Sequence, residues 1–237
     1  MNKVINRKGC ILILARAGSK GIANKNMIDV CGKPLIYYAI KAAKDFGNLD
    51  IFVSSDSKEI LDYAKSLKVL TVERPINISN DLSLDLEGFE HFFNIYKEYD
   101  YSVHLRATFP LINKNIIESA NELFLKNYDK FDSLRSVIPV SQSPYKMWHI
   151  DEGIAKTVIP GNTQHSSPRQ IIKNSFIQNA CIDITKRKNV LESKNMTGRK
   201  CLPYIMKKTD NIDIDNINDL KEAINAIRIR DGKQPSR

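Results

Sequence analysis

The first half of the chain alternates between short apolar runs and stretches with helical spacing. Residues 10–15 are apolar without polar alternation, which is typical of a strand buried on both faces in a parallel sheet. Two further strands are predicted at 51–53 and 69–72, with helices between the strands. The first helix is predicted to begin at Gly32-Lys33-Pro34, with Pro34 in its first turn. This βαβαβ order predicts a doubly wound, mostly parallel α/β sheet.

The same rhythm continues to residue 140 and is then interrupted. The predicted order is a helix at 86–96, a strand at 101–105, a helix after Asn113 and a strand at 134–140. From 143 to 173, prolines and glycines separate short extended pieces, so we expect an insertion outside the main sheet. Residues 1–237 are therefore predicted to form a single domain that carries the insertion 143–173.

Two acidic residues near the end of the chain form the motif Asp213-x-Asp215. A strand at 211–215 would place both carboxylates on one face, because side chains alternate along a strand. Two carboxylates, together with phosphate oxygens and water, are ligands that suit Mg²⁺. The alternative is structural, in which Asp215 or Asn216 only caps the last predicted helix.

The loop after the first predicted strand is small, flexible and basic. Gly18 and Gly21 let the backbone come close to a ligand. They are surrounded by three cations, Arg16, Lys20 and Lys25. Ligands of open α/β sheets bind beyond the carboxyl ends of the strands, so this loop suits a polyphosphate; the alternative is an ordinary solvated turn. Neither a P-loop nor the G-x-G-x-x-G fingerprint follows the strand.

Composition adds a preference for an anionic partner. The formal net charge is +9, but no run of five basic residues is present, so nucleic acid is not an expected partner. No pair among the four cysteines has C-x-x-C spacing, which argues against zinc and fits a reduced, cytoplasmic setting. The first residues do not resemble a signal peptide, and no stretch approaches the ~20 apolar residues of a spanning helix, so no membrane association is expected.

The basic loop also has a specific spacing. The sequence Ala15-Arg16-x-x-Ser19-Lys20-Gly21-x-x-x-Lys25-Asn26 resembles the first motif of the acylneuraminate (CMP-sialic acid) cytidylyltransferases. In that family this loop wraps the triphosphate and base of CTP. Asp213-x-Asp215 followed by Asp219-Leu220 resembles the metal motif of the same family. The resemblance implies a Rossmann-like nucleotidyltransferase fold, CTP and a nonulosonic acid as substrates, Mg²⁺ as cofactor, and a homodimer built by the insertion.

Three further segments carry the resemblance. Arg74 and Ser83 match a nucleotide-binding Arg and Ser of the family, and the segment 106–111 resembles its motif Leu-Gln-Pro-Thr-Ser-Pro-Leu. Arg169 and Asn179, ten residues apart, match the Arg and Asn that bind the sugar acid in the family. The implied roles are catalysis for Arg16 and Lys25; nucleotide binding for Ser19, Lys20, Asn26, Arg74 and Ser83; substrate binding for Arg106, Thr108, Arg169 and Asn179; and metal binding for Asp213 and Asp215.

Several positions near the implied sugar site depart from the family pattern. Arg106 stands where Gln is common, Ile177 where Arg is frequent, and Asp183 where Tyr is usual; Ala180 replaces a Gly. A site built to bind one set of substituents rejects analogues that leave its polar groups unpaired. We therefore predict that N-acetylneuraminic acid (Neu5Ac) is a poorer substrate than another nonulosonic acid, such as legionaminic or pseudaminic acid. The alternative is that Arg106 and Asp183 pair with each other.

The activity implied by the resemblance is that of a CMP-nonulosonate synthetase, in which the anomeric hydroxyl of the sugar attacks the α-phosphate of CTP and releases pyrophosphate. A Kdo-type or other sugar nucleotidyltransferase is an alternative. Kdo enzymes usually carry an Arg near Lys20 and a Gln-Gly-Asp-Glu-Pro segment near Arg106, and neither is present. A non-catalytic nucleotide-binding module is a third reading, against which the presence of both Asp213 and Asp215 argues.

Overall fold

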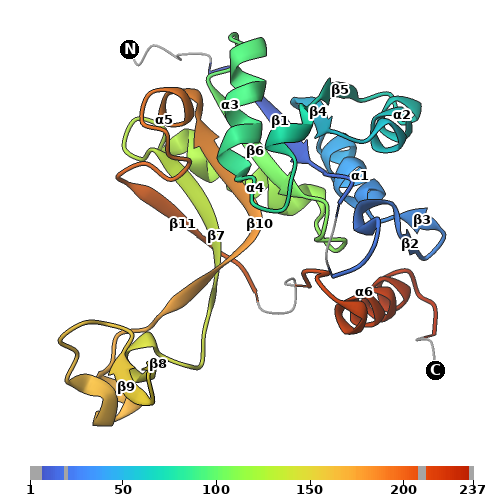
Figure 1. The fold of residues 1–237 in the computed structure, drawn as a ribbon. Coiled ribbons are helices and arrows are strands. Elements are labelled where there is room, and N and C mark those ends of the chain that lie inside the picture. The colour runs from blue at the N-terminus through green and yellow to red at the C-terminus, as the bar shows by residue number, and fades with distance from the viewer. Residues whose placement is uncertain (1–6, 19–20, 208–211, 235–237) are drawn as a thin grey trace.

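A computed structural model describes residues 7–18, 21–207 and 212–234, and a seven-stranded sheet organises them (Figure 1). The strand order is β11-β7-β10-β6-β1-β4-β5. The strands are β1 (Gly9–Leu14), β4 (Asp50–Ser55), β5 (Leu70–Glu73), β6 (Tyr101–Arg106), β7 (Ser133–Pro139), β10 (Phe176–Lys186) and β11 (Cys201–Ile205). Within this described sheet, only β10 runs antiparallel to its neighbours, so the predicted doubly wound, mostly parallel α/β fold is confirmed.

The interior strand β1 is buried on both faces, as its apolar run predicts. It pairs in parallel with β4 on one side and β6 on the other. Its side chains divide between two apolar clusters, with Ile11 and Ile13 on one face and Cys10 and Leu12 on the other. Residues 10–13 are fully buried and Leu14 is partly buried, which explains why no polar residue interrupts the run.

Five helices cover the two faces of the described sheet: α1 (Ile36–Phe46), α2 (Lys58–Ser66), α3 (Asp85–Ile95), α4 (Lys114–Lys126) and α5 (Arg187–Leu191). A sixth helix, α6 (Ile217–Arg230), lies apart from the sheet. Residues of α1, α2 and α4 share one core cluster, whereas α3 and α5 contribute to the cluster on the other face. The aromatic residues Phe89, Phe92 and Phe93 of α3 are fully buried, so they form core. Helix α6 packs beside β2 (Asp29–Val30) and α1 rather than on the main sheet.

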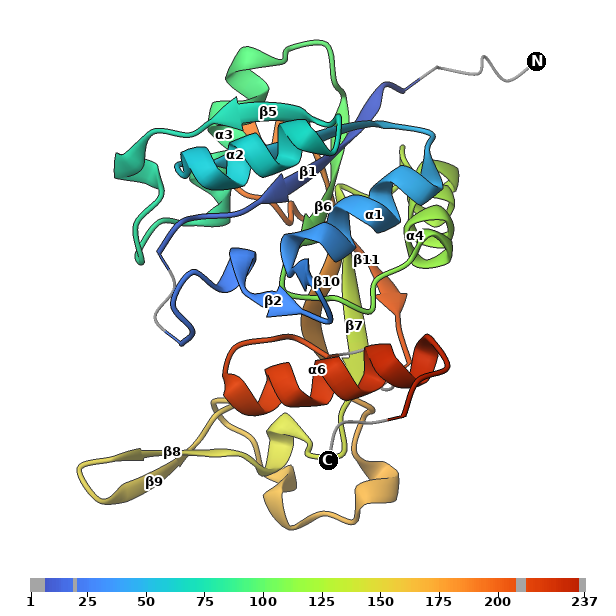
Figure 2. The same cartoon turned by 90° about the vertical axis from the view of Figure 1, so that its right-hand side faces the viewer.

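The residues 143–173 lie outside the main sheet. Strands β7 and β10 continue away from the body as a two-stranded ribbon, in which Phe176 pairs with Pro139 (Figure 1). The ribbon carries a separate hairpin of β8 (Trp148–Asp151) and β9 (Ile154–Thr157). Three short 3₁₀ turns complete this part: η3 (Pro144–Lys146), η4 (Gln164–Ser166) and η5 (Arg169–Ile171). Figure 2 shows the hairpin projecting below the body of the protein.

Two sequence predictions about local structure are wrong. Pro34 lies in the short strand β3 (Lys33–Pro34), which pairs with β2, and the helix begins only at Ile36. The backbone of Cys31 and Gly32 has positive φ, which closes a tight hairpin before the helix.

The second error concerns residues 212–215, which form no strand; residue 211 lies outside the described part. Ile214 is fully buried in the cluster that includes α6, and its N–H donates to the carbonyl oxygen of Thr108 (3.0 Å). The segment is therefore anchored by the buried Ile214 side chain and by hydrogen bonds to other parts of the chain, not by a strand partner. Asn216 caps α6, as the structural alternative predicted. Within the described residues, no helix combines the length and apolar character needed to cross a membrane.

Candidate active site

A cavity of about 410 Å³ lies beyond the carboxyl ends of β1, β5 and β6. This is the edge at which open α/β sheets bind ligands, because the loops that follow parallel strands converge there. The cavity brings together eight of the predicted site residues. These are Arg16, Lys25, Asn26, Arg74, Ser83, Arg106, Thr108 and Asp215. Ser19 and Lys20 lie outside the described residues.

The loop after β1 is held in place by its own polar groups. The buried Asn26 side chain donates to the carbonyl oxygen of Arg16 (3.0 Å), and the N–H of Ala17 donates to the Asp56 carboxylate (3.0 Å). Arg16 crosses to the opposite loop, where Nη1 donates to the carbonyl oxygen of Asn80 (2.6 Å) and Nη2 lies 2.8 Å from the Asp81 carboxylate. Arg16 therefore ties the two loops together at the cavity.

The same loop packs tightly on the segment that carries Asp215. A Cβ at Gly21 would lie only 2.2 Å from the carbonyl oxygen of Asp215, so only glycine fits this approach. Lys25 Nζ donates to Asp215 Oδ1 at 2.8 Å. Two motifs 190 residues apart in the sequence thus meet in one site.

The loop after β5 supplies the opposite wall. Arg74 is buried, and its Nε donates to the Ser79 hydroxyl (2.8 Å). Burial lowers the pKa of Arg74, while the nearby Asp56 and Asp85 carboxylates oppose that shift. The Ser83 hydroxyl accepts from the N–H of Asn80 (3.0 Å), so it shapes the turn.

The strand β6 contributes Arg106, and the first residue of α3 contributes Asp85. Arg106 Nη2 donates to Asp85 Oδ2 at 2.6 Å. Burial favours a higher pKa for Asp85, but His104 and Arg106 outweigh it and the pKa lies below its usual range. The sequence did not identify Asp85 or His104 as site residues. Asp85 resembles an ordinary residue at the start of a helix, and His104 lies within a buried strand.

The Asp213 and Asp215 carboxylates are close enough to interact. Burial raises the pKa of Asp213, a Thr108 hydrogen bond lowers it, and the Asp215 charge raises it again. Asp213 Oδ1 is buried and has no hydrogen-bond partner among the described residues. Nowhere in the described chain do three or more His, Cys, Asp or Glu side chains gather to hold a metal ion. Two carboxylates with an open oxygen still fit Mg²⁺, which completes its coordination with phosphate oxygens and water.

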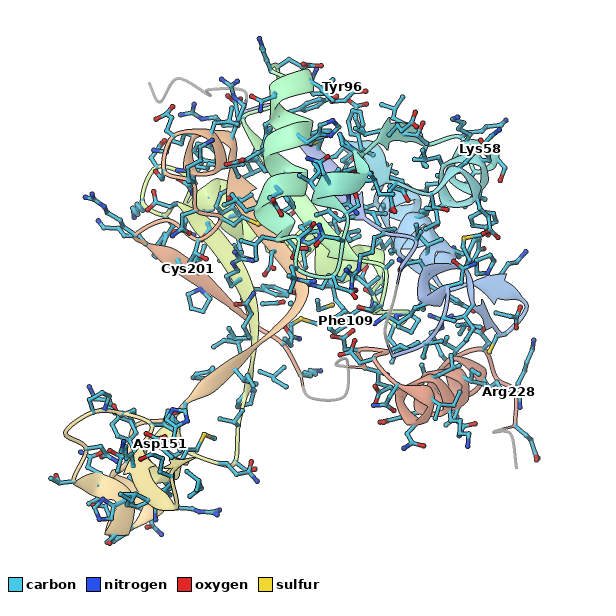
Figure 3. All side chains as sticks on the ribbon, in the orientation of Figure 1. Lys58, Tyr96, Phe109, Asp151, Cys201 and Arg228 are labelled. Carbon is cyan, nitrogen blue, oxygen red and sulfur yellow. The ribbon has the colours of Figure 1, made fainter. Side chains whose placement is uncertain are left out.

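Arg169 and Asn179 are not part of this cavity. Arg169 lines a second cavity, of about 370 Å³, at the base of the insertion together with Lys146 and Lys173. Figure 3 shows that the insertion is separated from the body of the protein: the labelled Asp151 of the insertion lies well away from the labelled Phe109 of the body.

Asn179 lies on β10, next to an irregularity in its pairing with β7. The register shifts between Gln178 and Asp183, and Ala180 has φ +57°, a conformation that glycine adopts more easily. The side-chain amide of Asn179 donates to Met206 Sδ (3.4 Å). The Gly that is usual in the resembling family would relieve strain at Ala180.

The structure shows where the residues that depart from the family pattern lie, and it tests the alternative that Arg106 and Asp183 pair with each other. Asp183 pairs with Arg135 (2.6 Å), whereas Arg106 pairs with Asp85, so the alternative of an Arg106–Asp183 pair is wrong. Ile177 lies on the ribbon and is 54% exposed. Of the three departures, Arg106 is therefore the one that lines the cavity.

Comparison with known proteins decides the family. A sequence model of the family described as cytidylyltransferase matches residues 10–152, more than half of the chain. N-acylneuraminate cytidylyltransferase of Escherichia coli is 28% identical over 214 residues, which cover 90% of this chain and 50% of that protein. Pseudaminic acid cytidylyltransferase of Campylobacter jejuni is 40% identical over 130 residues, 52% of this chain and 56% of that protein. The chain belongs to the acylneuraminate cytidylyltransferase family.

The chain spans about half the length of the curated relatives it matches. Solved structures agree on the fold of this family member. CMP:2-keto-3-deoxy-manno-octonic acid synthetase complexed with CTP has a TM-score of 0.66 at 13% identity, over 94% of this chain and 99% of that one. A cytidylyltransferase from Leptospira borgpetersenii has a TM-score of 0.60 at 16% identity, over 98% of both chains. At these identities the likeness shows the nucleotide-sugar transferase fold alone.

Proposed function

We propose that this protein is a CMP-nonulosonate synthetase that transfers CMP from CTP to the anomeric hydroxyl of a nonulosonic acid and releases pyrophosphate. We propose further that it is a cytoplasmic, Mg²⁺-dependent homodimer. The observation that carries the proposal is the single cavity in which Arg16, Lys25 and Arg74 meet the segment of Asp213 and Asp215. Membership of the family supports cytidylyl transfer as the reaction.

The residues of the cavity suit this reaction because phosphoryl transfer depends on positioning and charge neutralisation. The sugar oxygen forms a bond to the α-phosphorus, and the bond from that phosphorus to the pyrophosphate oxygen breaks. Arg16, Lys25 and Arg74 offer positive charge to the triphosphate along the cavity wall. Asp213 and Asp215 would hold Mg²⁺, which supplies further charge neutralisation when bound. No nucleophilic side chain is needed.

Removing a cation of the first loop tests the nucleotide site. Arg16→Ala and Lys20→Ala are each expected to raise the KM for CTP by roughly 10- to 100-fold, since a charge-assisted hydrogen bond contributes about 1.5–3 kcal/mol. The KM for the sugar acid is expected to change less. Steady-state kinetics with each substrate varied in turn measures both values, and Lys41→Gln on α1 is a control outside the cavity. An unchanged CTP response in both variants would show that the loop is only a turn.

The insertion is the proposed dimer interface. Large apolar side chains on it are exposed, including Ile150 at 73% and Ile154 at 61%. Exposed apolar clusters of this kind mark protein–protein contacts. The ribbon also holds Arg169 away from the cavity of its own chain. We propose that in the dimer Arg169 of one copy contributes to the cavity of the other.

We expect a homodimer by light scattering at micromolar concentration. Ile150→Asp combined with Ile154→Asp is expected to give a monomer, because two charges would be buried without partners in the interface. Ile229→Asp on α6, where the isoleucine is also exposed, is the matched control and should stay dimeric. A monomeric wild-type protein contradicts the proposal.

The substrate is tested by one panel, in which Neu5Ac, legionaminic acid and pseudaminic acid are each combined with each nucleoside triphosphate and Mg²⁺. Pyrophosphate release and product mass are the readouts. We expect CTP to be used, and kcat/KM for Neu5Ac to be lower than that for legionaminic or pseudaminic acid, because Arg106 replaces the usual Gln in the cavity. Best use of Neu5Ac would overturn the substrate prediction alone. Absence of pyrophosphate release with every sugar would instead favour a non-catalytic nucleotide-binding module.

A further inference from the structure

A line of charged and polar side chains crosses the sheet beneath the cavity. Asp183 on β10 is the register neighbour of His104 on β6 and of Arg135 on β7. Arg135 and Asp183 form an ion pair at 2.6 Å, with side chains only 14% and 2% exposed. Residues 104, 183 and 135 therefore form a buried row that ends at the cavity, where His104 is part of the lining.

A second ion pair continues the row into the cavity. Arg106 lies two residues beyond His104 on β6 and pairs with Asp85 at 2.6 Å. These two side chains are 35% and 36% exposed, so unlike Asp183 and Arg135 they are accessible to a ligand. Both line the cavity.

The row as a whole carries no net charge. The carboxylates of Asp85 and Asp183 are matched by the guanidinium groups of Arg106 and Arg135. Burial lowers the pKa of His104 to about 3, so the imidazole is neutral at neutral pH. A buried ion pair adds little stability by itself, because desolvation offsets the Coulomb attraction.

We propose that the Asp85–Arg106 pair is a specificity-determining subsite that binds a neutral hydroxyl group of the sugar. This inference rests on the proposed function of the cavity. Arg106 donates an N–H to the hydroxyl oxygen, and the hydroxyl donates its own hydrogen to the Asp85 carboxylate. The Asp183–Arg135 pair lies beside His104, two residues from Arg106 along β6, and keeps the surroundings of the subsite neutral.

The chemistry of the pair favours a hydroxyl over the other groups of a sugar acid. A carboxylate would meet the Arg106 donor but would also face the negative charge of Asp85, which already pairs with that donor. A trans secondary amide points its C=O and N–H in opposite directions, so it cannot use a donor and an acceptor that are adjacent. A hydroxyl accepts and donates at one atom, so it can accept from another N–H of Arg106 and donate to the Asp85 carboxylate while the two side chains stay paired at 2.6 Å.

The test compares the best sugar substrate of the wild-type protein with its monodeoxy analogues, each lacking one hydroxyl. kcat/KM is measured for wild type, Arg106→Gln and Asp85→Asn. In the wild type, one analogue is expected to lose roughly 10- to 100-fold, because it leaves charged groups without a partner. The same analogue should lose less than about threefold in both variants, whereas the KM for CTP stays unchanged. Lys41→Gln, which breaks an exposed ion pair on α1, is the matched control and should behave as wild type.

Other outcomes separate the alternatives. If both variants lower kcat/KM for every analogue by the same factor, the pair has a structural role and the inference is wrong. A further analogue, with the carboxylate of the sugar converted to an amide, tests the other possibility. If Arg106→Gln reduces the preference of the enzyme for the sugar over this amide, and leaves its preference for the sugar over each monodeoxy analogue unchanged, Arg106 binds the carboxylate and the inference is also wrong. If wild-type protein releases no pyrophosphate from CTP with any sugar acid, the proposed function itself fails and this inference fails with it.

Discussion

Replacing either Asp213 or Asp215 with Asn is expected to lower turnover by on the order of 100-fold while the fold is retained. Asp213 Oδ1 is buried with no described hydrogen-bond partner, and Asp215 is 71% exposed beside Lys25. Asn keeps the volume of each side chain but removes the negative charge that a hard divalent cation requires. Neither change opens a cavity in the apolar core, so the loss should appear in activity and not in unfolding temperature.

The measurement needs a readout of the metal as well as of turnover. Binding of Mn²⁺ to the protein with CTP, followed by electron paramagnetic resonance, should weaken in both variants. Asp45→Asn on α1, where the carboxylate pairs with Lys41 at the surface, is the control and should bind Mn²⁺ as wild type does. Wild-type turnover at saturating Mg²⁺ in both Asp213→Asn and Asp215→Asn would remove the metal assignment and leave the capping of α6 as the role of this segment.

The sheet was predictable because its signals are local. A short, fully apolar run such as residues 10–15, followed by a glycine-bearing loop, favours a strand buried on both faces. Asn113 caps α4 with its side chain, as its position before an apolar repeat indicates. The errors arose where a tertiary contact overrides the local preference. Pro34 is suited to a first helical turn, yet it lies in β3 and pairs with β2. Ile214 packs in the apolar cluster of α6 and is not part of a strand.

The site divides in the same way. Arg16 and Arg74 follow parallel strands and Arg106 is the last residue of one. The carboxyl ends of such strands converge, so the meeting of these residues could be predicted. The position of Arg169 could not, because it depends on how far the β7–β10 ribbon extends from the body. Asp85 escaped notice because its role comes from a partner on another element.

The second large effect is expected at Gly21. Its backbone approaches the carbonyl oxygen of Asp215 so closely that an added Cβ would lie 2.2 Å away, far inside van der Waals contact. The Asp215 backbone cannot yield easily: its N–H donates to the Asp219 carboxylate (2.9 Å), and its neighbour Ile214 is fully buried and bonded to Thr108. In Gly21→Ala the loop that carries Arg16 and Lys25 must therefore move.

We expect Gly21→Ala to lower kcat/KM for CTP by about 100-fold, because a displacement of roughly 1 Å in groups that position a substrate has an effect of this size. Gly18→Ala is the matched control, since a Cβ there meets nothing within 4 Å and the same loop gains the same methyl group. Steady-state kinetics and unfolding temperatures are measured for both variants. The comparison distinguishes the steric clash of a Cβ at position 21 with Asp215 from an effect of reduced loop flexibility. Equal losses in both variants would mean that flexibility of the loop matters and the contact with Asp215 does not. A loss confined to Gly21→Ala would show that nucleotide use depends on the contact between the first loop and the Asp213–Asp215 segment.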